Sequence, residues 1–125
     1  MKEQNDQIFI RNLLVRSILG INPSEREKKQ DILINMTIDV PPFPINAPDE
    51  MNSSINYRSI CKRVIALVES SSFQLIETLA THVLQQLFNE FELMRVAITI
   101  DKPHALRFAE SVGFSMTRTA EDFSE

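Results

Sequence analysis

Asp31-Ile32-Leu33-Ile34-Asn35-Met36-Thr37-Ile38-Asp39-Val40 is the stretch of this chain that decides its fold class. Apolar residues recur along it with the period of two that is typical of a β-strand with one buried face. That face is predicted to carry Ile32, Ile34, Met36, Ile38 and Val40. Pro41-Pro42-Phe43-Pro44 then ends the strand, because proline cannot donate a hydrogen bond to a sheet.

A second strand is predicted before this one, over residues 8–19, which are rich in β-branched and apolar side chains. Its alternation slips near Asn12-Leu13-Leu14, as a β-bulge would produce. Gly20 ends the strand, residues 21–25 are expected to form a loop, and Arg26-Glu27-Lys28-Lys29 is expected to be a solvated hairpin tip. The pattern predicts two strands joined by a charged connection.

Two amphipathic helices are predicted after these strands, the first from Tyr57 to the break at Ser70-Ser71-Ser72, and the second ending near Asn89. Their apolar stripes are Tyr57, Ile60, Cys61, Val64 and Val68 in the first helix, and Ile76, Leu79, Ala80, Val83, Leu84 and Leu87 in the second. Two short alternating strands follow, over residues 94–100 and 112–116. The acidic tail at 119–125 is expected to fray.

The predicted element order is strand, strand, helix, helix, strand, strand. This order favours an α+β domain in which a four-stranded antiparallel sheet carries both helices on one face. We expect a single domain over residues 1–125, with its core at about 8–118. An open sheet has two exposed edges that usually need a partner, so we also expect a homo-oligomer.

Composition narrows the function classes. A net charge of −4 leaves no basic footprint for nucleic acid. A single cysteine, Cys61, excludes an intrachain disulfide and suits a reducing compartment. No apolar run is long enough to span a membrane, and residues 1–7 do not resemble a signal peptide, so we expect a cytoplasmic protein. With two histidines and one cysteine, no metal-ligand pair stands at motif spacing, and we expect no metal site.

The candidate reactive residue is Lys102, which follows the strand at 94–100 and precedes Pro103. A residue before proline favours extended backbone, so Lys102 is expected at the rim of the sheet where the strand stops. A lysine held there is well placed to carry protons. The ordinary alternative is a solvated lysine that caps a strand.

Five segments, taken in order, also match a known pattern. They are Ile18-Leu19-Gly20-Ile21 with Glu25, Gln30-Asp31-Ile32-Leu33-Ile34-Asn35, Asn56-Tyr57-Arg58, Leu75-Ile76-Glu77-Thr78-Leu79, and Asp101-Lys102-Pro103-His104-Ala105-Leu106-Arg107-Phe108-Ala109-Glu110-Ser111-Val112. With them the chain resembles the dihydroneopterin aldolase family, and within it the dihydroneopterin triphosphate epimerase branch. The resemblance implies the tunnelling fold (T-fold), in which four sheets close into a barrel and two such rings stack into an octamer. It also implies active sites at subunit interfaces, with no metal or organic cofactor.

The resemblance implies that Glu77 anchors the pterin substrate, because one carboxylate can accept from the two adjacent N–H donors of its pyrimidine edge. Backbone groups of Ile55, Ile76 and Ile21 would add contacts. From the residues alone, the favoured interpretation of Glu77 is a first-turn carboxylate stabilised by the helix dipole. Tyr57 would contact the substrate of a neighbouring subunit, although its position also suits the first core residue of a helix.

In the same resemblance, Glu25 orients the substrate side chain or a water, and Lys102 transfers protons. The reaction breaks the bond between the first two side-chain carbons, and the dihydropterin ring accepts the electrons. If glycolaldehyde escapes, the enzyme is an aldolase of folate synthesis; if the fragment is held and re-adds, it is an epimerase.

His104 and Arg107 are implied to meet a triphosphate tail, with a loop histidine and a surface arginine as the plain alternative. The loop Asn22-Pro23-Ser24 departs from both branches. A non-catalytic ligand-binding or assembly protein on the same fold is the third reading.

Overall fold

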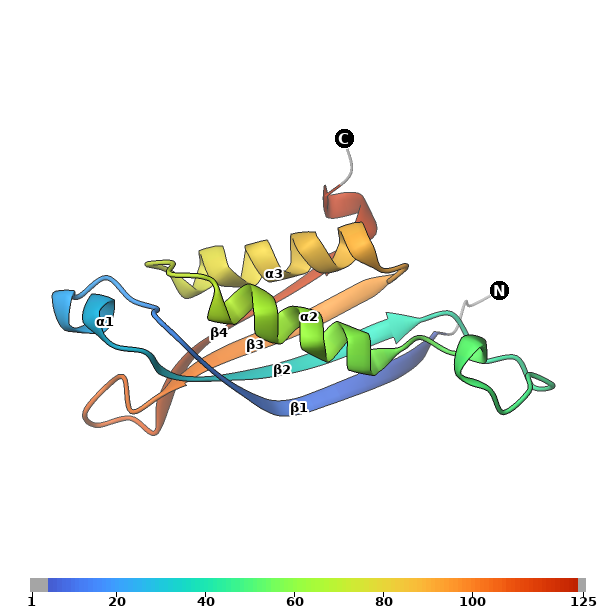
Figure 1. Ribbon diagram of the computed structural model, residues 1–125, viewed down its shortest axis with the longest axis horizontal. Helices are drawn as coiled ribbons and strands as arrows, with labels where there is room; N and C mark the ends of the chain where they lie inside the picture. The colour runs from blue at the N-terminus through green and yellow to red at the C-terminus, as the bar shows by residue number, and fades with distance from the viewer. Residues whose placement is uncertain (1–4, 124–125) are drawn as a thin grey trace.

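Strand β2 (Gln30–Val40) lies inside a four-stranded sheet in the computed structural model, which describes residues 5–123. The other strands are β1 (Asp6–Ser17), β3 (Arg95–Pro103) and β4 (Ser111–Thr119). The sheet order is β1-β2-β3-β4, and every neighbouring pair is antiparallel (Figure 1). The predicted antiparallel sheet is therefore confirmed.

The predicted bulge lies in β1 at Asn12. Ile10 pairs with Met36 and Leu13 with Ile34, so β1 has one residue more than β2 between these two pairs. Asn12 has a φ of 53°, and its N–H donates to the Asn35 side-chain oxygen at 2.8 Å. The extra residue keeps apolar side chains on the same face of β1 before and after the bulge.

Two long helices, α2 (Tyr57–Glu69) and α3 (Ile76–Glu90), cover one face of the sheet (Figure 1). The side chain of Asn56 caps α2 by accepting the Ser59 N–H at 3.2 Å. The alternating face of β2 packs against the helix stripes to form the core. Its fully buried large side chains include Leu19, Ile32, Ile34, Ile38, Ile60, Val64, Val68, Leu79, Leu84, Leu87, Ile98 and Ile100.

The structure corrects two sequence expectations near Lys102. Strand β3 does not stop at Ile100, because Lys102 pairs with Val112 and Pro103 with Ser111. Extended backbone before a proline prolongs the strand here instead of marking its end. The expected loop at 21–25 is instead largely the short helix α1 (Pro23–Glu27), which begins with proline at its first position.

The chain after β4 differs from the frayed tail expected there. Thr119 belongs to β4, and Ala120–Phe123 form the 3-10 helix η2. The Phe123 ring packs 5.6 Å from the ring of Phe88. Apolar contact with α3 holds this turn in place; residues 124–125 lie outside the described part of the chain. No helix within residues 5–123 is long and apolar enough to cross a membrane.

Candidate functional site

Lys102 is buried, with 8 % of its surface exposed, although it sits near the end of a strand. Its ammonium group donates to Glu25 Oε2 at 2.8 Å and lies 3.5 Å from the carbonyl oxygen of Leu19. The alternative of a solvated capping lysine is therefore wrong. A buried ammonium beside one carboxylate is an arrangement suited to proton transfer.

Glu25 is held in place from the short helix α1. Its Oε1 accepts the N–H of Asn22 at 3.3 Å, while its Oε2 faces Lys102. The hydrogen bond from Lys102 lowers the pKa of Glu25, outweighing the opposite effect of burial. Because the pKa is lower in the folded chain, the pair stabilises the fold at neutral pH, and this contribution is lost as pH falls through the folded pKa. The two side chains thus form an ion pair under ordinary conditions.

Gly20 lies directly against the Glu25 carboxylate. A Cβ atom built on Gly20 would overlap the carboxyl group of Glu25, and the φ of Gly20 is 144°, which side-chain-bearing residues rarely adopt. The Gly20 N–H also donates to the carbonyl of Phe73 at 3.2 Å. Glycine at this position lets the loop approach close enough for Glu25 to reach Lys102.

Arg26 joins the two loops around this pair, and the sequence analysis missed it. Its guanidinium donates to the carbonyls of Gly20 at 3.2 Å, Phe73 at 3.1 Å and Ser72 at 2.7 Å. The prediction of a solvated hairpin tip is therefore wrong for Arg26. The signal that could have found helix α1 was Asn22-Pro23 with an acid at position 25, a typical helix start. Two of the three carbonyl partners, those of Ser72 and Phe73, in contrast come from a distant loop.

Ile76 and Glu77 begin helix α3, right after the loop that Arg26 binds. Glu77 is exposed, and within residues 5–123 no hydrogen bond or ion pair occupies its carboxylate. Ile21, which is 63 % exposed, follows Gly20 on the opposite loop. The structure therefore places five residues of the predicted site at the same end of the folded domain: Ile21, Glu25, Ile76, Glu77 and Lys102.

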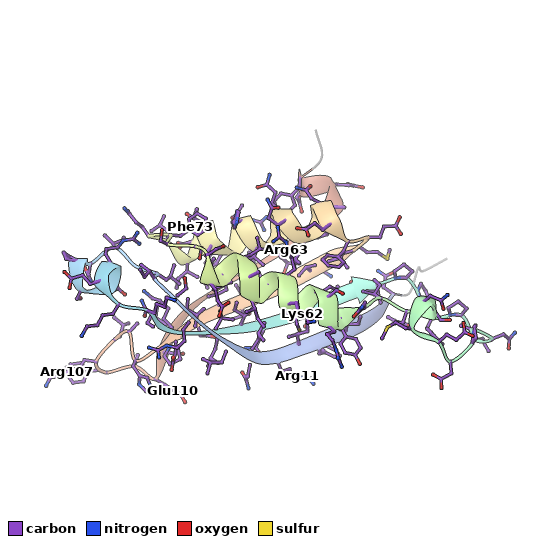
Figure 2. All side chains as sticks on the ribbon, viewed as in Figure 1. Arg11, Lys62, Arg63, Phe73, Arg107 and Glu110 are labelled. Atoms are coloured by element: carbon purple, nitrogen blue, oxygen red, sulfur yellow. The ribbon has the colours of Figure 1, made fainter. Side chains whose placement is uncertain are left out.

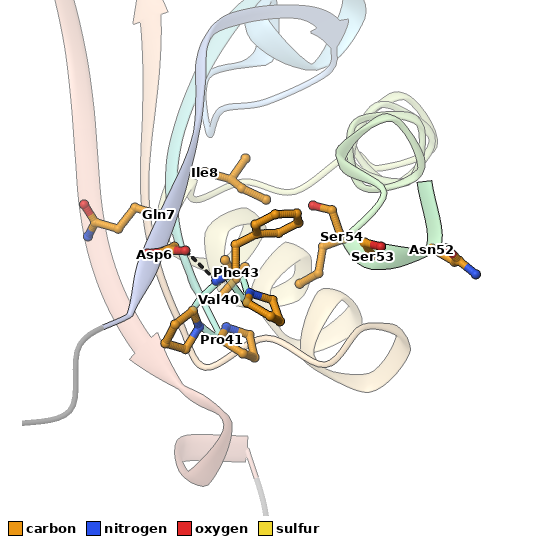
Figure 3. A pocket seen from close by; sticks show the side chains of 12 residues that line it. Asp6, Gln7, Ile8, Val40, Pro41, Phe43, Asn52, Ser53 and Ser54 are labelled. Atoms are coloured by element: carbon orange, nitrogen blue, oxygen red, sulfur yellow. Dashed lines mark hydrogen bonds between the residues drawn. The ribbon is translucent and has the colours of Figure 1, made fainter. Parts of the chain in front are cut away.

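Ile55 and Tyr57 lie at the other end. Ile55 lines an apolar pocket where β2 ends. Phe43 and Val40, labelled in Figure 3, line the same pocket. Val40 is seven residues beyond Leu33, the β2 partner of Asp101, or roughly 23 Å at about 3.3 Å per residue. Tyr57, at the first position of α2, is 58 % exposed and is not the core residue its stripe suggested. One subunit alone does not bring these two residues to Lys102.

His104 and Arg107, paired in the sequence analysis, are separated by the structure. His104 has a φ of 65° and lines a pocket of about 380 Å³ that also contacts Glu25. Arg107 lies at the tip of the β3–β4 connection, where its guanidinium sits 5.5 Å from the centre of the exposed Phe108 ring (Figure 2). Only His104 lies next to the Glu25–Lys102 pair.

Possible metal ligands, the single cysteine and the second histidine are the other candidate groups within the described residues. No group of three or more histidine, cysteine, aspartate or glutamate side chains there could hold a metal ion. Cys61 is half-buried on α2, and burial raises the pKa of its thiol. The His82 ring packs 5.3 Å from that of Phe73. The ionisable side chains of the candidate site at this end of the domain are Glu25, Lys102, Glu77 and His104.

Comparison with known proteins identifies the family of this chain. The family model for dihydroneopterin aldolase matches residues 8–117. The chain is 36 % identical to the dihydroneopterin triphosphate 2'-epimerase of Escherichia coli (strain K12) over 110 residues, which cover 88 % of this chain and 92 % of that protein. It is 29 % identical to the dihydroneopterin aldolase of Streptomyces coelicolor over 100 residues, covering 80 % of this chain and 84 % of that protein.

Among solved structures, the E. coli dihydroneopterin aldolase in complex with neopterin superposes with a TM-score of 0.85 at 26 % identity. The match covers 90 % of this chain and 98 % of the aldolase chain. The family model spans most of the described sheet and both long helices. This protein belongs to the dihydroneopterin aldolase family.

Proposed function

We propose that this protein inverts the configuration at C2' of the trihydroxypropyl side chain of 7,8-dihydroneopterin triphosphate. The observation that carries this proposal is the buried ammonium of Lys102, 2.8 Å from the Glu25 carboxylate. The 36 % identical E. coli relative is named for this epimerisation. The reaction needs a proton carrier beside the substrate side chain, and the buried Lys102 paired with the half-buried Glu25 can serve as one.

In the proposed reaction, Lys102 first passes a proton to Glu25, since an ammonium group cannot accept one. The neutral amine then takes the proton of the C2' hydroxyl through a water molecule. The C1'–C2' bond breaks, C2' becomes an aldehyde, and the bonding electrons move into the conjugated imine of the dihydropterin ring as an enamine. Re-addition of C1' to the other face of the aldehyde reforms the bond, and the proton returns to the oxygen.

The second candidate is a dihydroneopterin aldolase, which the S. coelicolor relative is named for. It shares every step up to bond cleavage, after which C1' is protonated and the aldehyde leaves. In both reactions the exposed carboxylate of Glu77 would accept the two N–H donors of the pterin edge, next to backbone groups of Ile76 and Ile21.

Chromatography of the products from phosphorylated and unphosphorylated dihydroneopterin tests the proposal. We expect the triphosphate to give its 2'-epimer with little 6-hydroxymethyl-7,8-dihydropterin. If both substrates give only the cleaved pterin, the aldolase assignment is correct. If neither substrate changes, the protein is a binding or assembly protein instead of an enzyme.

The proposed site is completed by a neighbouring subunit. Ile55 and Tyr57 lie at the end of the folded domain opposite to Lys102. Within the described residues, β1 pairs only with β2, and β4 pairs only with β3, so both sheet edges are open to a partner. A second copy that pairs edge to edge would bring its Tyr57 towards this Lys102. Closure into a barrel, with two stacked rings, is the arrangement we propose.

Light scattering at micromolar concentration is expected to give the mass of a homo-octamer, or at least of a ring of four chains. Activity should be lost on dilution below the concentration at which the oligomer dissociates, because each site needs two chains. A monomer that retains full activity would contradict both the assembly and the shared site.

A further inference from the structure

The pocket beside the catalytic pair carries positive charge that the proposed proton transfer does not use. Its lining includes Glu25, His104 and Gln30, together with Lys28 and Lys29. Its volume of about 380 Å³ is enough for several phosphate-sized groups. Glu25 forms the wall shared between this pocket and Lys102. A substrate tail that leaves the reacting carbons can therefore enter the pocket directly.

The two lysines are free to bind an anion. Within residues 5–123 neither Lys28 nor Lys29 forms an ion pair, while the charge of Glu25 is matched by Lys102. Their backbone is fixed, because Lys28 ends helix α1 and the carbonyl of Lys29 accepts a hydrogen bond from Arg16 at 3.2 Å. The pocket therefore has a net positive charge on an anchored backbone. A polyphosphate is the ligand class that such a lining favours.

We propose that Lys28 and Lys29 bind the triphosphate of the substrate, and that this binding determines whether the reaction ends in inversion or in cleavage. The inference rests on the proposed function and deepens it. When the C1'–C2' bond breaks, the triphosphate stays on the two-carbon aldehyde and not on the pterin. Glu77 therefore retains the pterin half, and the lysine pocket retains the aldehyde half.

The retained aldehyde can turn about its own flexible CH₂–O link and present its other face to C1'. Without a triphosphate, the fragment is glycolaldehyde, which has no charged group that the two lysines could bind. One active site then gives mainly epimer from the triphosphate and mainly cleavage from the unphosphorylated substrate. The specificity comes from fragment retention, while the chemistry at Lys102 is the same in both cases.

The test is the double variant Lys28→Gln/Lys29→Gln, with the ratio of cleaved to inverted product as its readout. With the triphosphate substrate, we expect this ratio to rise about tenfold or more, and KM to rise as well, because two charge-assisted contacts are lost. Turnover of the unphosphorylated substrate should not change. Lys62→Gln is the matched control, since Lys62 is an exposed lysine on α2 (Figure 2).

A probe that does not depend on turnover separates this inference from the proposed function. Inorganic tripolyphosphate should bind the wild-type protein in calorimetry and bind the double variant about tenfold or more weakly, with a strong dependence on salt. Equal affinity for both proteins would overturn the pocket assignment even if epimerisation is observed. A wild-type product ratio in the double variant would overturn it too.

Arg107→Ala tests the alternative in which the triphosphate tail binds along the β3–β4 connection. Arg107 lies outside the pocket, at the tip of the β3–β4 connection. If this substitution, and not the lysine double variant, shifts the product ratio of the triphosphate substrate, the tail lies along that connection and the inference is wrong. If wild-type protein converts neither substrate, the proposed function itself fails.

Discussion

Replacing Lys102 by alanine should lower kcat by about 10²–10⁴-fold on both phosphorylated and unphosphorylated dihydroneopterin, the usual contribution of a general acid–base group. Both inversion and cleavage begin with removal of the same hydroxyl proton. Affinity for neopterin should stay close to that of the wild type, because recognition of the ring is assigned to Glu77 and backbone groups. The loss therefore falls on turnover and not on binding. Timed activity assays measure kcat, and calorimetry measures the affinity for neopterin, so the effects on turnover and on binding are separated.

The Lys102 variants need a control for folding, since removal of the ammonium leaves Glu25 half-buried without its cation. Lys102→Met keeps most of the buried side-chain volume and removes only the charge and the transferable proton. Equal loss of kcat in the two variants, with unchanged oligomer mass and thermal unfolding, would assign the effect to proton transfer. Full turnover in either variant would remove Lys102 from the reaction.

Glu77→Gln should weaken pterin binding by about 2–5 kcal/mol, which is enough to abolish it at ordinary ligand concentrations. A carboxylate accepts from both N–H donors of the pterin edge, whereas the amide offers one acceptor and one mismatched donor. The fold should not change, because the Glu77 carboxylate is exposed and has no partner within the described residues. Calorimetry with neopterin measures the change directly.

The matched control for Glu77→Gln is Glu92→Gln, which makes the same substitution at an exposed position before β3. This control variant should bind neopterin as the wild type does. Near-normal affinity in the Glu77 variant would return that residue to the simpler role of a first-turn carboxylate that stabilises α3 through the helix dipole.

The sheet and long helices could be predicted because their signals are local. The alternation of Asp31–Val40 and the slip at Asn12 each depend on a few neighbouring residues, and both predictions are confirmed. The burial of Lys102 could not be predicted in this way. It depends on long-range contacts such as that with Glu25, whose carboxylate lies 2.8 Å from the Lys102 ammonium across 77 residues of sequence. Contacts that distant leave no periodic pattern.

The same limit explains the errors within the charged stretch after Gly20. Four successive charged residues are typical of a solvated turn, and Lys28 and Lys29 are indeed exposed. Arg26 differs because its guanidinium donates to the distant carbonyls of Ser72 and Phe73 as well as to the nearby carbonyl of Gly20. The site residues that the resemblance identified lie at two ends of one chain, a division that residue identity alone cannot reveal.

The three carbonyl contacts of Arg26 also affect the entropy of ligand binding. Two of them, to Ser72 and Phe73, tie the segment that carries Glu25 to the loop that precedes Glu77 before any ligand arrives, and the third, to Gly20, lies within the Glu25 segment itself. Ordering a flexible loop costs roughly 1–2 kcal/mol for each residue fixed, and here this cost is met during folding. The two halves of the proposed binding surface are therefore preorganised, and more of the contact free energy remains available for affinity.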